Sequence, residues 1–116
     1  MDVSRAIVLL RQRSALRRDE RERRAAEVQR VVAQAVRRVV PPQSRVWLIG
    51  SLAWGGFGEH SDVDLVVENL PAELMLALER AIVAAADARV DLLELGALPE
   101  GFRQRVETEG VLLCGT

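Results

Sequence analysis

Two consecutive prolines, Pro41 and Pro42, divide the chain into two parts that cannot share one helix. Proline lacks a backbone N–H and fixes φ, so a helix that reaches this point must end there. Upstream, residues 2–40 carry apolar side chains at three- and four-residue steps, the spacing of one buried helical face. These side chains are Ala25, Val28, Val32, Ala35, Val36 and Val39. The sequence therefore predicts a helical first part and a second part that contains the strands.

Charge is divided in the same way. Residues 1–45 carry twelve arginines and five acidic residues, a net charge of +7, whereas residues 46–116 carry four arginines and twelve acidic residues, a net charge of −8. The total of −1 excludes a uniformly basic nucleic-acid binder. The chain contains no lysine and no tyrosine, which excludes mechanisms that need either side chain from this protein.

Eight consecutive charged residues, 17–24, precede the apolar helical stripe. Opposite charges four residues apart can support a helix there, and the candidate pairs are Arg18–Glu22, Asp19–Arg23 and Glu20–Arg24. We therefore predict a basic helical arm, residues 1–24, ahead of a core domain, residues 25–116. One long helix and two helices with a solvated joint both agree with this pattern.

Cysteine content and apolar runs bear on the compartment. Cys114 is the only cysteine, which excludes an internal disulfide and a cysteine-based zinc site. The longest apolar run near the N-terminus, residues 6–10, is too short for the core of a signal peptide, and no stretch is long enough to span a membrane. We expect a cytoplasmic protein without membrane contact.

After the prolines, short elements alternate along the chain. Apolar runs predict strands, glycine clusters predict loops, and prolines at the start of apolar periodicity predict helices. The expected order is a strand at 45–49, a glycine-rich loop at 50–58 that opens with a short helical turn, a strand at 62–67, a helix at 71–87, a strand at 90–95, a helix from 99 that ends at Gly110, and an edge strand at 111–113. The class is α/β (α+β), with an N-terminal helical arm.

Two aspartates stand out on the second predicted strand. Asp62 and Asp64 are two residues apart, so both carboxylates point to one face of the sheet, while Val63 and Leu65 point into the core. Adjacent carboxylates repel unless a cation lies between them, and Mg²⁺ prefers oxygen ligands of this kind. Asp91 occupies the same relative place in the next strand. Three such carboxylates can hold two metal ions about 4 Å apart, the arrangement used for in-line phosphoryl-type displacement.

Gly50 and Ser51 form the second half of the candidate site. Gly50 allows close approach of the backbone to a ligand, and backbone N–H groups with a serine hydroxyl can hold a phosphate. Alone, each feature is commonly structural, because an Asp-x-Asp pair often occurs in turns and a Gly-Ser pair is less specific still. The joint order of strand, Gly-Ser, glycine loop, Asp-x-Asp strand, helix and Asp-bearing strand favours a functional interpretation.

That order resembles a known family. Gly50-Ser51, followed after ten residues by Asp62-x-Asp64, resembles the signature of the DNA polymerase β nucleotidyltransferase superfamily. The strings GSLAWG and SDVDLVV are similar to its smallest branch, the minimal nucleotidyltransferases, over about residues 28–113. The resemblance implies the nucleotidyltransferase fold, a small mixed β-sheet flanked by helices.

The resemblance also implies an activity. It implies transfer of a nucleoside monophosphate from a nucleoside triphosphate, ATP, to an acceptor hydroxyl. Asp62, Asp64 and Asp91 would bind Mg²⁺, two ions when nucleotide is present, and Gly50 and Ser51 would hold the triphosphate. Asp91 would lie nearest the acceptor and take its proton.

Some residues depart from the family. Many relatives carry arginine where Trp54 stands; Trp54 could stack on a base or pack against the fold, and we favour packing. His60, the only histidine, precedes the aspartates, and we expect it to be a solvent-facing loop residue. The basic arm does not map onto the family.

A partner is also implied. Minimal nucleotidyltransferases act as antitoxins of HEPN-domain ribonuclease toxins, in some cases by adenylylating a toxin tyrosine. At 116 residues the chain has no room for a separate acceptor-binding domain, so we expect a HEPN-type toxin to supply the acceptor. Two alternatives stay open: a catalytically silent antitoxin that only binds the toxin, and a nucleic-acid-contacting module that uses the arginine-rich arm. Acidic residues within the arm disfavour the latter, so direct nucleic-acid binding is not expected.

Overall fold

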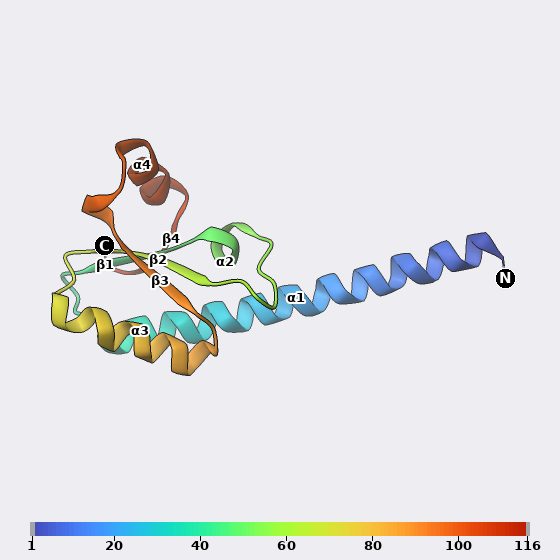
Figure 1. Ribbon diagram of the computed structural model, residues 1–116, viewed down its shortest axis with the longest axis horizontal. Coiled ribbons are helices and arrows are strands. Elements are labelled where there is room, and N and C mark those ends of the chain that lie inside the picture. Colours follow the sequence, from blue (N-terminus) through green and yellow to red (C-terminus); the bar gives the residue numbers. More distant parts are fainter. Residues whose placement is uncertain (1, 116) are drawn as a thin grey trace.

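The computed structural model describes residues 2–115, in which helices alternate along the chain with the strands of a single sheet (Figure 1). The elements are α1 (Val3–Val39), β1 (Arg45–Ile49), α2 (Gly50–Trp54), β2 (Val63–Glu68), α3 (Ala72–Ala86), β3 (Val90–Glu94), the short 3₁₀ turn η1 (Leu95–Ala97), α4 (Glu100–Glu109) and β4 (Val111–Cys114). Their kinds and order follow the sequence prediction, except for η1, which was not expected.

The sheet is mixed, as predicted. Its strands lie in the order β3-β2-β1-β4. β1 pairs antiparallel with both β2 and β4, whereas β2 and β3 run parallel. Parallel neighbours need a crossover connection, and α3 provides it between β2 and β3. The sheet therefore places residues at corresponding positions of β2 and β3 side by side.

A single uninterrupted helix forms the first third of the chain. α1 spans 37 residues, is capped by the Asp2 carboxylate, which accepts a hydrogen bond from the Ser4 N–H at 3.0 Å, and ends just before Pro41. Its buried positions begin at Val28, and the exposed N-terminal half projects away from the body (Figure 1). The arm and the core thus share one helix without a joint. No helix within residues 2–115 is long and apolar enough to cross a membrane.

The ion pairs expected in the arm do not form. In the described part of the chain, none of the pairs Arg18–Glu22, Asp19–Arg23 and Glu20–Arg24 makes a salt bridge; the bridge found in α1 joins Arg30 to Glu27. Exposed pairs of this kind gain little free energy in water, so nothing forces the side chains together. The arm arginines are thereby left available for other contacts.

The sheet has an apolar layer on each face. α1 and α3 cover one face, where Val46, Leu48, Val63, Leu65 and Val67 of the strands meet Val32, Val36, Leu78 and Ile82 of the helices. α4 and η1 lie over the other face (Figure 1), where the smaller cluster contains Trp47, Ile49, Val66, Leu95 and Val106. The second face is only partly covered, and this is the face that carries the aspartates.

Two helix ends differ from expectation in their backbone. Gly110 ends α4 as predicted, but its φ of −67° is extended rather than left-handed. The left-handed residue is Asp87 at the end of α3, with a φ of 50°. Glycine at position 110 is instead explained by space, since a Cβ there would meet the Val106 carbonyl and the Trp47 side chain.

Candidate functional site

Asp64 and Asp91 lie side by side on neighbouring strands. The parallel register of β2 and β3 pairs Asp64 directly with Asp91. Val63 and Leu65, which flank Asp64, are fully buried on the face toward α1 and α3. Because side chains alternate along a strand, Asp64 points to the opposite, partly open face. The predicted separation of core and carboxylate faces is therefore correct.

The carboxylates are crowded enough to affect ionisation. Burial raises the pKa of Asp64, and the negative charges of Asp91 and Asp62 and a hydrogen bond with Asp91 raise that pKa further. Each of these causes disfavours the ionised form of Asp64. A cation between the carboxylates would reverse this effect, so the donor set suits a hard, oxygen-seeking ion such as Mg²⁺.

Asp62 lies just before β2 and faces a different neighbour. Its Oδ1 is 3.2 Å from Nε of Arg89, whose side chain is 86% exposed. Within residues 2–115, no three His, Cys, Asp or Glu side chains converge as a ready metal-binding cluster. Asp64 and Asp91 thus form a close pair, whereas Asp62 would lose its bond to Arg89 if it turned fully toward them. The bond it would lose is exposed, and such ion pairs cost little to break.

Gly50 packs directly against Asp64. Its φ is +71°, in the left-handed region, and a Cβ added there would overlap the Asp64 carboxylate, with Asp64 Cγ only 3.2 Å away. Position 50 therefore requires glycine both for backbone conformation and for space. Ser51 follows at once and is half-buried. Of the sequence-predicted residues, Gly50, Asp64 and Asp91 thus lie together, Ser51 adjoins them along the chain, and Asp62 is paired with Arg89 instead.

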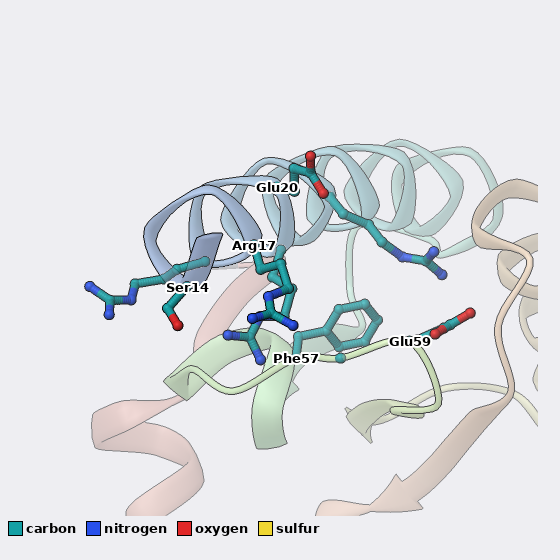
Figure 2. A pocket seen from close by; sticks show the side chains of 9 residues that line it. Ser14, Arg17, Glu20, Phe57 and Glu59 are labelled. Carbon is teal, nitrogen blue, oxygen red and sulfur yellow. The ribbon is translucent and has the colours of Figure 1, made fainter. Parts of the chain in front are cut away.

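Two adjoining cavities lie between α1 and the loop that follows α2. The larger, about 510 Å³, is lined by Phe57 and Glu59 of the loop and by Ser14, Arg17 and Glu20 of α1, as Figure 2 shows, together with Arg18, Arg21, Arg24 and Gly58. The smaller, about 270 Å³, is lined by Ser51, Leu52, Gly55, Gly56 and Phe57 together with Arg18, Arg21, Glu22 and Ala25. The aspartates line neither cavity, and Ser51 is the residue that links the smaller one to the candidate site.

Sequence reasoning did not find the arginines of these cavities, although a signal was present. Arg18 and Arg21 stand seven and four residues before Ala25, on the same heptad positions as the apolar stripe of α1. The helix face that packs on the core therefore continues upstream as a cationic face. The buried side chain of Phe57 anchors the loop that follows α2 beside this cationic face.

Trp54 and His60 have structural surroundings. The indole N–H of Trp54 donates to the Glu109 carbonyl at 2.9 Å, and the Arg105 guanidinium lies 4.2 Å from the centre of its ring. Trp54 therefore joins α2 to α4, which agrees with packing rather than base stacking. His60 is exposed in the turn before β2, as expected.

The raised pKa of Asp64 leads to a prediction about stability. The proton on this carboxyl stabilises the fold fully below the unfolded-state pKa of about 3.8, and that stabilisation is lost as pH rises through the raised folded value. Asp64→Asn cannot ionise, so we expect it to have a higher Tm than wild type at pH 7. The difference should shrink as pH falls toward 4.

Thermal unfolding of both proteins between pH 4 and pH 8 measures this effect. Glu94→Gln, which neutralises an exposed carboxylate on the neighbouring edge strand β3, is the matched control and should leave Tm nearly unchanged at every pH. A Tm of Asp64→Asn equal to or below that of wild type at pH 7 would contradict the prediction.

Comparison with known proteins places this geometry in a family. A model of the nucleotidyltransferase domain matches residues 29–112. No curated protein matches the chain in sequence.

Solved structures resemble the chain as well. A toxin–antitoxin structure with AMP-PNP is 28% identical, with a TM-score of 0.60 over 75% of this chain and 73% of that chain. A mutant of the toxin–antitoxin MntA–HpeT is 28% identical, with a TM-score of 0.58 over 76% of this chain and 72% of that chain. A tri-AMPylated Shewanella oneidensis HEPN toxin in complex with MNT antitoxin is 25% identical, with a TM-score of 0.51 over 80% of this chain and 73% of that chain.

The family match spans most of the chain, from the buried half of α1 to β4, and includes every residue of the candidate site. The mixed sheet and its flanking helices agree with it. The resemblance predicted from the sequence is therefore confirmed: the chain belongs to the nucleotidyltransferase domain family.

Proposed function

We propose that this protein is an adenylyltransferase antitoxin, which transfers AMP from ATP to a hydroxyl of a HEPN-domain toxin. Its membership of the nucleotidyltransferase family supports the reaction type. The similar structures that contain AMP-PNP and a tri-AMPylated HEPN toxin support ATP as the donor and a HEPN protein as the acceptor. The chain has no tyrosine, so a tyrosine acceptor must lie on another protein.

The observation that carries the proposal is the register of Asp64 with Asp91, with Gly50 packed against Asp64. We assign Asp62, Asp64 and Asp91 as metal ligands, and Gly50 and Ser51 as the residues that hold the triphosphate. Mg²⁺ bound there would neutralise the charge that develops on the α-phosphate and on the leaving oxygen. Asp62 would change partner from Arg89 when the site is filled.

The remaining chemistry belongs to the side chains. The acceptor hydroxyl oxygen attacks the α-phosphorus, the bond from that phosphorus to the oxygen bridging to the β-phosphorus breaks, and pyrophosphate leaves. Asp91 lies on the exposed edge strand, open to an approaching protein, and we assign it as the base that takes the hydroxyl proton. Ser51 and the backbone near Gly50 hold the pyrophosphate portion in place.

Two broader assignments accompany the proposal. We assign catalysis to residues 25–116 and treat residues 1–24 as an arm, a division that follows burial along α1. We place the protein in the cytoplasm, where ATP and Mg²⁺ are available to it.

The test is a transfer assay. The full chain is incubated with α-labelled ATP, Mg²⁺ and a HEPN-domain toxin, and the products are analysed by gel and by peptide mass spectrometry. We expect label on a hydroxyl side chain of the HEPN protein, dependent on Mg²⁺, with loss of its ribonuclease activity.

Inhibition of the HEPN ribonuclease without attachment of AMP would distinguish the main alternative from the proposed transferase. If the HEPN ribonuclease is inhibited in the absence of ATP, and no AMP is attached when ATP is present, the protein is a catalytically silent antitoxin. Complete lack of binding to the HEPN protein would contradict both.

A further inference from the structure

We propose that Arg18 and Arg21 of α1 bind the β- and γ-phosphates of the nucleoside triphosphate, in the groove between α1 and the glycine loop. This inference rests on the proposed function above and extends it, because it adds side chains from the arm to the nucleotide site. The groove is the 270 Å³ cavity together with the larger cavity beside it.

The groove is continuous with the candidate site through one dipeptide. Gly50 packs on Asp64, and Ser51, the next residue, lines the same cavity as Arg18 and Arg21. A ligand that runs from the aspartates past Ser51 therefore enters the space in front of these arginines. A triphosphate has this extended form, with its reacting phosphate at one end and its most charged phosphate at the other.

The arginines are free to bind an anion. In the described part of the chain, neither Arg18 nor Arg21 forms a salt bridge or a side-chain hydrogen bond. Glu22 lines the same cavity, and Glu20 and Glu59 line the neighbouring one, but Arg17 and Arg24 lie there as well, so the groove remains cationic. A guanidinium presents paired N–H donors that match phosphate oxygens.

The glycine motif itself supplies no cation. α2 has the sequence GSLAW and contains no basic residue, and the side chain of its last residue, Trp54, is bound to α4. A triphosphate carries several negative charges, which backbone N–H groups and one hydroxyl do not balance. Helix α1 provides both arginines that line this cavity together with Ser51, so it completes the charge balance from another element.

The experiment measures ligand binding by calorimetry, using ATP, AMP and inorganic tripolyphosphate. The test variant is Arg18→Gln/Arg21→Gln. The control is Arg11→Gln/Arg13→Gln, which removes the same charge from the same helix but lies outside both cavities. We expect the test variant to bind ATP and tripolyphosphate about 10- to 100-fold more weakly, and AMP within about twofold of wild type. All four residues are exposed, so thermal unfolding should be similar for the three proteins.

Several results would overturn the inference. Unchanged ATP affinity in the test variant would do so. A loss of AMP affinity equal to the loss of ATP affinity would also do so, because AMP lacks the β- and γ-phosphates that the arginines are proposed to bind. An equal loss in the control would indicate general charge on the arm. If a short RNA bound wild type more tightly than tripolyphosphate did, and both variants lost it, the arm would be a nucleic-acid surface.

The transfer assay separates this inference from the proposed function. If wild type adenylylates the HEPN protein and the test variant does so with an unchanged KM for ATP, the inference fails while the proposed function stands. If wild type transfers nothing, yet tripolyphosphate binding depends on Arg18 and Arg21, the function fails and the groove stands as a polyphosphate site. A raised KM for ATP with a retained kcat supports both.

Discussion

Asp64→Asn is expected to reduce nucleotide transfer to the HEPN protein by about 1,000-fold or more, because charge stabilisation by a bound metal contributes several kcal/mol. Asparagine keeps the shape of the side chain but removes the negative charge that would hold the metal beside Asp91. The rate of AMP attachment under saturating ATP and Mg²⁺ measures the effect.

Variants of the other two aspartates test whether all three carboxylates are needed for transfer. Asp91→Asn should lose as much activity, because it removes both a ligand and the proposed base. Asp62→Asn should also be severely impaired, although the loss of its ion pair with exposed Arg89 should change stability little. Glu94→Gln, which lies on the same edge strand as Asp91, should keep near wild-type activity.

Stability distinguishes lost chemistry from lost structure. Asp64→Asn is expected to unfold at a higher temperature than wild type at pH 7, so its inactivity cannot come from unfolding. Activity retained within about tenfold of wild type in Asp64→Asn would remove the carboxylate pair from the mechanism.

Gly50→Ala is expected to destabilise the fold by about 2–5 kcal/mol. A left-handed backbone costs a residue with a Cβ about 1–2 kcal/mol, and overpacking adds about 1–3 kcal/mol. The φ of Gly50 is +71°, and the new Cβ would overlap the Asp64 carboxylate. Urea unfolding at constant pH measures the loss.

A double-mutant cycle tests whether the contact with Asp64 causes part of that loss. Asp64→Ala removes the carboxylate that the new Cβ would meet, so Gly50→Ala should cost less in that background, with a coupling close to the overpacking cost of about 1–3 kcal/mol. Gly56→Ala serves as the control: its φ is +88°, but a Cβ there would meet nothing within 4 Å, so it should show no coupling to Asp64. Additive effects for Gly50 and Asp64 would exclude the contact as the cause.

Local sequence patterns predicted the helices and strands because each helix or strand buries side chains at a regular spacing. Alternation in 62–67 placed Val63 and Leu65 in the core and the aspartates outside it, and the structure agrees. The sequence also indicated that Asp64 and Asp91 occupy corresponding places, since each follows the start of its strand, and the structure pairs them. Roles for these residues in binding and catalysis remain predictions.

Other features depend on contacts between distant segments. No local pattern shows that β4 pairs with β1, or that Gly50 packs on Asp64. The ambiguity over one helix or two was resolved by the uninterrupted backbone of α1, whereas the ion pairs expected to support it do not form. The sequence placed Arg18 and Arg21 in the basic arm, but nothing near them indicates that the glycine loop returns to α1.

The unbroken course of α1 has a consequence for how its exposed half forms. An isolated helix must first complete an unfavourable nucleation step, and short helices without tertiary contacts are marginal for that reason. Here the buried half, from Val28 onward, completes that step during folding of the core, and the arm only extends an existing helix by one hydrogen bond per residue. Its order should therefore decrease gradually toward Val3, and amide hydrogen exchange should speed up in the same direction. A phosphate bound at Arg18 and Arg21 would fix the arm midway and slow exchange over the turns between the groove and the core.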